Sequence, residues 1–199
     1  MNSQDVAAST STSIHAQQGE AQPALVLVNL GTPTAPEPGP VRAFLREFLS
    51  DRRVIEMSPL LWKPILEGII LRVRPREVAA KYRSIWMEEG SPLMHYTREQ
   101  ARRLGERLPG VRVEVAMRYG QPSIGSVLDC LHADGVRRVA ILPAYPQYAA
   151  STVTTINDAV AQWIGRNRDG FEMRLHRSFP AAPAYIEALA IALERHWER

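Results

Sequence analysis

The feature that most constrains the fold of this chain is the alternation of short apolar segments with longer amphipathic ones. The short segments have the length and composition of buried or half-buried strands, and they lie at residues 24–28, 111–117, 138–142 and 171–176. Strands that alternate with helical segments predict a mostly parallel sheet with helices on both faces, joined by right-handed crossovers. We therefore predict an α/β fold.

Local signals indicate where the helices lie. Pro75 suits the first turn of a helix that continues to about Ile85, while Thr97 and Ser123 are suitable N-caps. Residues 60–73 are mostly apolar and form either a core-facing helix or an exposed lip that contacts a membrane or an apolar ligand. The other predicted helices span residues 41–49, 98–108, 123–132, 151–166 and 183–199.

Composition excludes several classes of protein. Apolar residues make up 45% of the 199-residue chain and charged residues 23%, which suits a packed domain rather than global disorder. The single cysteine, Cys130, excludes a disulfide framework and a Cys-rich metal site, and we expect it to be buried. No apolar run is long enough to span a bilayer. The formal net charge of +3 is too small to indicate nucleic-acid binding.

We expect a disordered tail at residues 1–22 and one α/β domain at residues 23–199. The tail is rich in Ser, Thr, Ala and Gln. It contains no Lys or Arg and therefore lacks the features of a signal or transit peptide, so we expect a cytoplasmic protein. The last predicted helix ends without a glycine cap or a following strand, which leads us to expect a fragment of a longer protein.

A ligand site is expected where the predicted strands end, because open parallel sheets bind ligands beyond the carboxyl ends of their strands. The loops at this edge carry aromatic rings, one arginine and several hydroxyl groups, without an acidic cluster. This combination suits a large, flat, anionic ligand. The expected rim residues are Asn29, Leu30, Gly31, Thr32, Arg118, Tyr119, Tyr145, Gln147, Tyr148, Ser151 and Thr152.

Each of these features also has a purely structural interpretation. Tyr145 and Tyr148 are about as suited to loop packing as to ligand contact. Arg118 is equally suited to pairing with a nearby carboxylate. Gly31 is explained by a tight turn alone, and the segment around it lacks the full glycine pattern of dinucleotide-binding loops.

Several sequence motifs together resemble the ferrochelatase family, and most closely its bacterial protoporphyrin type. The resemblance covers about residues 24–199, with the motifs in the family's order and spacing. They are LVLVNLGTP at 25–33, FLSDRRV at 48–54, GSPL at 90–93, RYG at 118–120 and LPAYPQYAAST at 142–152.

This resemblance implies a protein of two similar α/β halves that inserts Fe²⁺ into protoporphyrin IX, held in the cleft between them. It places Leu30 against the macrocycle, and the apolar segment 60–73 at a lip that meets a membrane or the apolar edge of the substrate. Arg118 and Tyr119 match positions that flank the macrocycle. The predicted substrate-binding residues are Leu30, Arg74, Tyr82, Ser91, Arg118, Tyr119 and Tyr148, of which Arg74, Tyr82 and Ser91 match positions on the propionate side or the lip.

The chain also departs from the family pattern. The family's catalytic His, in a Ser-x-His-Gly/Ser-hydrophobic-Pro motif, and its later acidic partner are both absent. The resemblance therefore implies an N-terminal half with no catalytic residue or metal ligand of its own, inactive without its missing C-terminal half. Where some members carry a cysteine, this chain has Ala149, Ala150 and Ser151, so no iron–sulfur cluster is expected. Iron enters as a substrate, and no tightly bound cofactor is expected.

Two other functions are compatible with the residues. One is a porphyrin-binding module without catalysis, and the other is a nucleotide-binding α/β domain that uses the loop 29–33. Within the resemblance, Leu30 favours protoporphyrin, because the coproporphyrin-using branch often has Tyr at this position.

Overall fold

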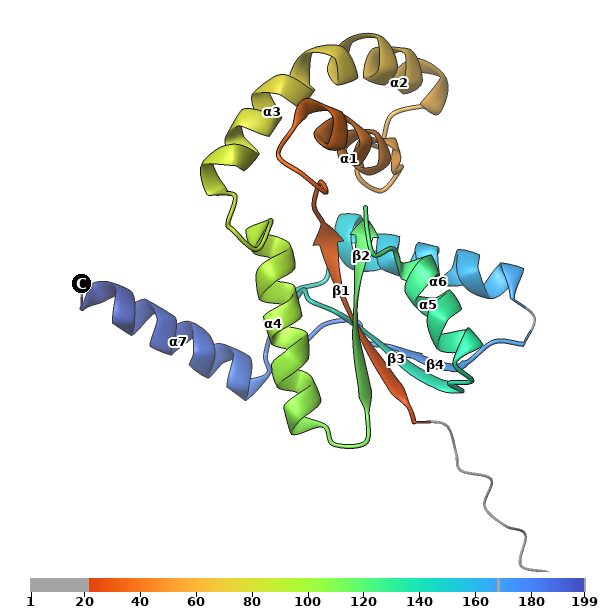
Figure 1. Ribbon diagram of the computed structural model, residues 1–199, viewed down its shortest axis with the longest axis vertical. Coiled ribbons are helices and arrows are strands. Elements are labelled where there is room, and N and C mark those ends of the chain that lie inside the picture. Colours follow the sequence, from red (N-terminus) through yellow and green to blue (C-terminus); the bar gives the residue numbers. More distant parts are fainter. Residues whose placement is uncertain (1–21, 168, 199) are drawn as a thin grey trace, which may run out of the picture.

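A computed structural model describes residues 22–167 and 169–198, so nearly all of the predicted tail lies outside the described residues. Four parallel strands form one sheet in the order β2-β1-β3-β4 (Figure 1). The prediction of a parallel α/β fold is confirmed. The strands are β1 (Ala24–Gly31), β2 (Arg112–Tyr119), β3 (Arg138–Pro143) and β4 (Glu172–Leu175).

The strand order determines which helices cover each face of the sheet. The chain moves from β1 to β2 in one direction and then returns past β1 to β3, so right-handed crossovers place the connecting helices on opposite faces. Helix α4 (Pro92–Arg107) packs on one face, against β1 and β2, while α5 (Ile124–Ala133) and α6 (Thr155–Arg166) lie together on the other (Figure 1).

The remaining helical elements lie before α4 and around α6. Four consecutive helical elements form an arm beyond the end of β1 (Figure 1). They are α1 (Pro38–Ser50), α2 (Pro59–Ile65), the π-helical turn η1 (Leu66–Ile70) and α3 (Leu71–Ile85). A second π-helical turn, η2 (Ala150–Thr154), leads directly into α6, and α7 (Pro183–Trp197) follows β4.

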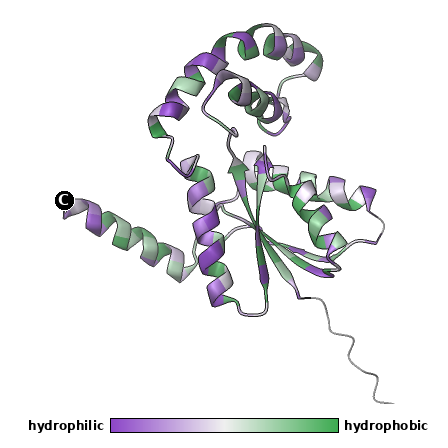
Figure 2. Ribbon diagram, viewed as in Figure 1, coloured by the Kyte–Doolittle hydropathy of each residue, from purple (hydrophilic) through white to green (hydrophobic). Residues whose placement is uncertain are grey.

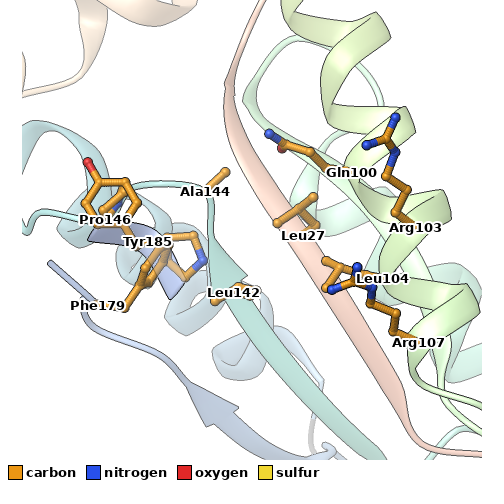
Figure 3. A pocket seen from close by; sticks show the side chains of 11 residues that line it. Leu27, Gln100, Arg103, Leu104, Arg107, Leu142, Ala144, Pro146, Phe179 and Tyr185 are labelled. Atoms are coloured by element: carbon orange, nitrogen blue, oxygen red, sulfur yellow. The ribbon is translucent and has the colours of Figure 1, made fainter. Parts of the chain in front are cut away.

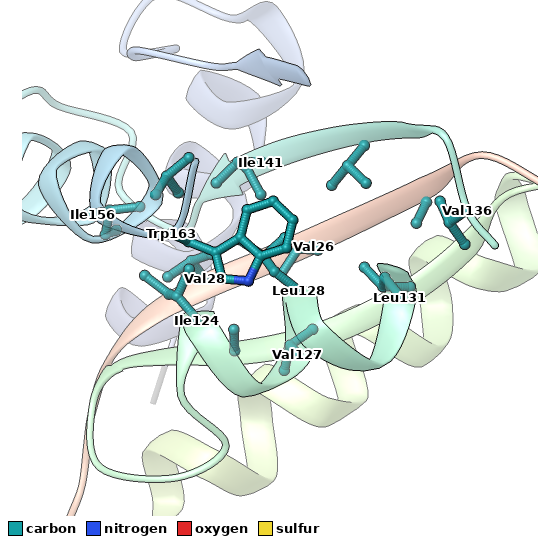
Figure 4. Close-up of a cluster of buried hydrophobic side chains, with 14 residues drawn as sticks. Val26, Val28, Ile124, Val127, Leu128, Leu131, Val136, Ile141, Ile156 and Trp163 are labelled. Atoms are coloured by element: carbon teal, nitrogen blue, oxygen red, sulfur yellow. The ribbon is translucent and has the colours of Figure 1, made fainter. Parts of the chain in front are cut away.

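The main core fills the space between the sheet and the pair α5 and α6 (Figure 4). Trp163 is 2% exposed and stacks on Phe171 with ring centroids 4.9 Å apart. Its indole nitrogen donates to Asp129 Oδ1 at 2.7 Å, which satisfies the one polar group that this ring buries. Cys130 is exposed, so the expectation of a buried cysteine is wrong. The buried stripe of α5 consists of Ile124, Val127, Leu128 and Leu131, and Cys130 lies outside it.

Pro75 lies inside α3 rather than at the start of a helix, which corrects the predicted boundary. A proline in this position cannot donate to the carbonyl of the residue four positions earlier. That residue is Leu71, and the Arg42 side chain of α1 donates from Nε to the Leu71 carbonyl at 2.9 Å. This hydrogen bond supplies the partner that Pro75 cannot, and the helix continues without a break.

The apolar residues of α2, η1 and α3 are largely exposed, so a core-facing helix at 60–73 is wrong. Leu66 and Leu71 are buried, whereas Leu60, Leu61, Ile69 and Val73 are between 59% and 87% exposed. A single helical arm packed on α1 buries only one of its faces. Figure 2 shows hydrophobic residues along α2 and along α7, and none of the described residues of α7 is buried. None of the described helices is both long and apolar enough to cross a membrane.

Gly31 is required where β1 ends beside β2. Its φ angle is +117°, and a Cβ atom there would lie 1.8 Å from the carbonyl oxygen of Tyr119. No side chain fits into this contact. The glycine therefore allows the ends of the two strands to lie directly side by side.

We expect Gly31→Ala to destabilise the protein by about 3 kcal/mol or more, because it adds backbone strain to an impossible contact. The melting temperature should fall by about 6–12 °C in a thermal unfolding experiment. Gly125→Ala in α5 is the matched control, since nothing lies within 4 Å of its added Cβ, and it should stabilise by about 0.4–1 kcal/mol. Equal melting temperatures for Gly31→Ala and the unsubstituted protein would contradict this account.

Candidate functional site

A cavity of about 420 Å³ lies between the carboxyl end of β1 and the first turns of α4. It brings together two of the predicted substrate-binding residues, Tyr82 and Ser91, which come from the end of α3 and from the N-cap of α4. Asn29 and Gly31 at the end of β1, with Thr32 directly after it, form its opposite wall.

Hydrogen bonds fix this wall relative to α4. Asn29 Nδ2 donates to Thr97 Oγ1 at 2.9 Å, and the Thr97 hydroxyl in turn donates to the Leu93 carbonyl at 2.6 Å. The Asn29 side chain also accepts from the Leu30 amide at 2.8 Å. Ser91 Oγ accepts from the Met94 amide at 3.2 Å and so caps the helix. The end of β1 and the start of α4 are therefore one structural unit.

The electrostatics of this cavity favour an anion. The N-terminus of α4 borders it and carries a partial positive charge. Burial raises the pKa of Tyr82, an effect that the nearby Thr32 hydroxyl partly opposes, so the phenol keeps its proton and can donate a hydrogen bond at neutral pH. Thr32 is 6% exposed, and its hydroxyl lies outside hydrogen-bonding geometry with every described residue. The cavity thus combines hydroxyl groups with a helix N-terminus.

Arg118 and Tyr119 form a second polar group, at the end of β2. Arg118 Nε donates to Thr155 Oγ1 at 2.7 Å and to the Thr155 carbonyl at 2.8 Å. Its Nη2 donates to Asp51 Oδ2 at 2.6 Å, and the two side chains of this ion pair are only 19% and 10% exposed. Arg118 therefore pairs with a carboxylate, as its structural interpretation predicts. Its contact with a substrate stays a prediction.

Tyr119 and Tyr145 have their hydroxyl groups inside the protein at this edge. The Tyr119 side chain is buried, and its hydroxyl donates to Asp51 Oδ2 at 2.9 Å. Burial, with smaller contributions from its neighbours, raises the pKa of Tyr119 to about 12. Burial also raises the pKa of Tyr145, whose buried hydroxyl has no hydrogen-bond partner among the described residues. The sequence places Tyr145 in the loop directly after β3, which is the signal that marks it as a rim residue.

The other predicted residues lie apart from these two groups. Leu30 is half-buried between Asn29 and Gly31. Arg74 is exposed on α3, where its charge contributes to lowering the pKa of Glu77, mainly an effect of Lys81. Tyr148 is 45% exposed, its hydroxyl lies 2.7 Å from Thr154 Oγ1, and the guanidinium of Arg177 lies 4.6 Å from its ring centroid. Their roles toward a ligand stay predictions.

The most voluminous of the described cavities, at about 530 Å³, lies elsewhere, between α4 and the start of α7 (Figure 3). Leu27, Leu104 and Leu142 form its apolar floor, and Phe179 and Tyr185 form one wall. None of the predicted substrate-binding residues lines it. Among the described residues, no group of three or more His, Cys, Asp or Glu side chains is arranged to hold a metal ion.

Comparison with known proteins identifies the family. The sequence model of the ferrochelatase family matches residues 22–199. The chain is 49% identical over 189 residues to the ferrochelatase of Methylibium petroleiphilum, covering 93% of this chain and 52% of that protein. It is 47% identical over 176 residues to the ferrochelatase of Stenotrophomonas maltophilia, covering 88% and 55%. It is 49% identical over 179 residues to ferrochelatase 1 of Shewanella oneidensis, covering 87% and 54%.

The chain spans about half the length of the curated relatives that it matches. The matched region contains the whole described sheet, the cavity at the start of α4 and the polar group at the end of β2. On these matches, the chain belongs to the ferrochelatase family.

Proposed function

We propose that this chain is the porphyrin-binding part of a ferrochelatase that inserts Fe²⁺ into protoporphyrin IX to form protohaem. The observation that carries the proposal is the cavity at the end of β1, where Tyr82 and Ser91 meet at the N-terminus of α4. Protoporphyrin is a large, flat, apolar ring with two propionate carboxylates on one edge. Hydroxyl donors beside a helix N-terminus suit such carboxylates.

In this proposal the cavity at the start of α4 and the residues at the end of β2 contact different parts of the porphyrin. Tyr82 and Ser91 bind the carboxylates. Leu30, at the end of the central strand, supplies apolar contact to the ring, and Arg118 holds the ring from the side of β2. The exposed Tyr148 and Arg74 extend the same rim. The apolar ring and its charged edge thus meet separate, matched surfaces.

Binding of the ring also contributes to the chemistry of metal insertion. A planar porphyrin presents its nitrogen lone pairs in the plane, and two N–H protons occupy its centre. Insertion of Fe²⁺ requires a bent ring, removal of both protons and a partly dehydrated metal ion. Binding energy at the ring edge can stabilise the bent form, because contacts remote from the nitrogens offset the strain.

The chain is proposed not to complete this reaction alone. Proton removal requires a general base within hydrogen-bonding reach of the pyrrole nitrogens, and Fe²⁺ is suited to imidazole and carboxylate ligands. The resemblance assigns these roles to a Ser-x-His-Gly/Ser-hydrophobic-Pro motif and a later acidic residue, and this motif does not occur in the sequence. The residues present bind the porphyrin and stabilise its bent form.

Two features refine the choice of ligand. Leu30 supports protoporphyrin over coproporphyrin, since it offers no hydroxyl group to an additional carboxylate. The alternative of a nucleotide site in the loop 29–33 loses its main support, because Gly31 is required by its contact with Tyr119. A porphyrin-binding module without catalysis would use the same porphyrin-binding residues, so only a metallation assay distinguishes it from a part of an enzyme.

The exposed apolar residues of α2 and η1 are proposed to form a lip that contacts the membrane surface. Leu60 is 87% exposed and Leu61 is 66% exposed, and Ile69 continues the same surface. Lys63 and Arg72 are exposed in the same segment, and the exposed Glu67 there is paired with Arg46. Apolar side chains flanked by cations suit the interface of an anionic bilayer.

We expect the 199-residue chain to bind protoporphyrin IX and Arg118→Ala to weaken this binding about ten- to a hundred-fold, the range for a lost charge-assisted hydrogen bond. Porphyrin fluorescence during titration with protein measures the affinity. Arg98→Ala, which removes an exposed arginine on α4, is the control and should bind normally.

In an anaerobic assay with Fe²⁺ and porphyrin, the chain alone should not exceed the metallation rate without protein, whereas a full-length ferrochelatase should.

Failure of the unsubstituted chain to bind porphyrin would refute this function. Equal affinities for Arg118→Ala and the unsubstituted chain would remove Arg118 from the site. Catalytic turnover by the chain alone would show that it contains a base and a metal site, and would refute its assignment as a binding part only.

We expect the chain to bind vesicles that contain anionic phospholipid more strongly than vesicles of phosphatidylcholine alone, as measured by vesicle flotation. Leu61→Glu should reduce this binding, because it places a carboxylate in the apolar contact. Leu189→Glu is the matched control, since Leu189 is exposed on α7. Equal losses for both variants, or no loss for Leu61→Glu, would contradict a lip at α2 and η1.

A further inference from the structure

The turn after α1 contains a carboxylate that joins distant parts of the chain. Asp51 belongs to the FLSDRRV motif, to which the resemblance assigns no role. Its Oδ1 accepts from the Arg53 amide at 2.8 Å, which closes the turn. Its Oδ2 accepts from Arg118 Nη2 at 2.6 Å and from the Tyr119 hydroxyl at 2.9 Å. One side chain thus connects the end of α1 to the end of β2.

A second contact holds the same turn against α6. The Arg53 guanidinium pairs with the Asp158 carboxylate, and both side chains are at least 42% exposed. The Asp51 side chain, by contrast, is 10% exposed. Exposed pairs contribute little on their own, whereas a buried carboxylate with three donors constrains its partners strongly.

These contacts leave Nη1 of Arg118 available to a ligand. Thr155 occupies Nε and Asp51 occupies Nη2, whereas Nη1 makes no hydrogen bond with any described residue. The guanidinium is planar and rigid, so fixing two of its nitrogens fixes the third. Its carbon also lies 4.4 Å from the centroid of the Tyr119 ring. Arg118 and Tyr119 therefore form a single unit with Asp51 and Thr155.

We propose that Asp51 is a positioning residue, which holds Arg118 and Tyr119 as one unit so that Arg118 Nη1 is presented to the porphyrin. This role rests on the proposed function. Asp51 itself is not a ligand contact in this proposal, since both of its oxygens accept from protein donors and the edge of the porphyrin is itself anionic. It acts through Arg118.

The chemistry of this position favours aspartate. An asparagine here keeps the size of the side chain but removes the charge that balances Arg118. Its amide also cannot accept from three donors as the two carboxylate oxygens do. Without that charge, the half-buried guanidinium is expected to turn toward solvent, because a buried cation is costly without a partner.

A purely structural role for Asp51 predicts a different outcome. If Asp51 only anchors the turn after α1, then breaking the other anchor of that turn should have a similar effect on porphyrin binding. Asp158→Asn removes that other anchor, and Asp158 is not among the porphyrin-binding residues. It is therefore the matched control for Asp51→Asn.

The first measurement uses Tyr119 and does not depend on porphyrin. Asp51 Oδ2 and Thr155 Oγ1 lie 2.9 Å and 3.4 Å from its hydroxyl, and the Arg118 guanidinium and Phe48 pack against its ring. Tyr145 is the other titratable group that interacts with it. Asp51 contributes to raising the pKa of Tyr119, so Asp51→Asn should lower this pKa from about 12 in an absorbance titration of the tyrosines. Tyr119→Phe identifies which part of the titration belongs to Tyr119.

The sign of the accompanying stability change follows from the raised pKa. Tyr119 keeps its proton more readily in the folded protein than in the unfolded chain, where the pKa of tyrosine is about 10. This stabilisation is fully present below pH 10 and is lost as the pH rises toward 12. In Asp51→Asn the loss should be complete at a lower pH than in the unsubstituted protein.

The second measurement is protoporphyrin binding by the 199-residue chain and its variants. Asp51→Asn should weaken binding about ten-fold, the lower end for a charge-assisted hydrogen bond. The double variant Asp51→Asn/Arg118→Ala should bind no more weakly than Arg118→Ala alone, because Asp51 acts through Arg118. Asp51→Glu, which keeps the charge, should bind more tightly than Asp51→Asn. Asp158→Asn should bind normally.

The outcomes separate this proposal from the proposed function. If the unsubstituted chain binds no porphyrin, the proposed function is refuted. If Asp51→Asn leaves the Tyr119 titration unchanged, the positioning role is refuted. It is also refuted if the double variant Asp51→Asn/Arg118→Ala binds porphyrin more weakly than Arg118→Ala alone. An equal loss in Asp158→Asn would also refute it, in favour of a general anchor for the turn. Should Asp51→Asn unfold, comparison of Asp51→Glu with the unsubstituted chain tests the same coupling.

Discussion

The placement of the two candidate groups, Tyr82 with Ser91 and Arg118 with Tyr119, depends on the central position of β1. This strand pairs in parallel with β2 on one side and with β3 on the other. Because the strands are parallel, the loops that follow them leave from one edge of the sheet, although β3 ends opposite Val28 and β2 ends opposite Gly31. Gly31 permits this arrangement, since only a residue without a side chain can lie against the Tyr119 carbonyl. The cavity of Tyr82 and Ser91 lies on one side of this strand end, and Arg118 lies beside the neighbouring one.

Two different kinds of interaction stabilise the two parts of this edge. At β1, the contacts are neutral hydrogen bonds from Asn29 through Thr97 to Leu93, which fix backbone and helix and leave a cavity open. At β2, a buried ion pair between Arg118 and Asp51 fixes a charged side chain in space. Neutral bonds shape the pocket, whereas the ion pair directs a charge. A ligand with a flat apolar body and a charged edge uses both.

Much of this fold follows from sequence pattern, because strand length, apolar spacing and cap residues are local properties. The parallel sheet and the helices that cover it were predictable on this basis. The exposure of the segment 60–73 was not, since an apolar helix is equally consistent with a core or with a surface until its partner is known. Pro75 illustrates the same limit: its tolerance inside α3 depends on Arg42, which is 33 positions away. Asp51 meets Arg118 across 67 positions, and no local pattern announces that contact.

The central claim is that porphyrin binds at the carboxyl edge beside β1 rather than in the larger cavity between α4 and α7. Nuclear magnetic resonance of the isotope-labelled chain, titrated with protoporphyrin IX, tests it directly. The account predicts that the amide signals of Gly31, Thr32, Leu93 and Tyr119 shift most. Shifts confined to Leu27, Leu104, Phe179 and Tyr185, which line the other cavity, would contradict it.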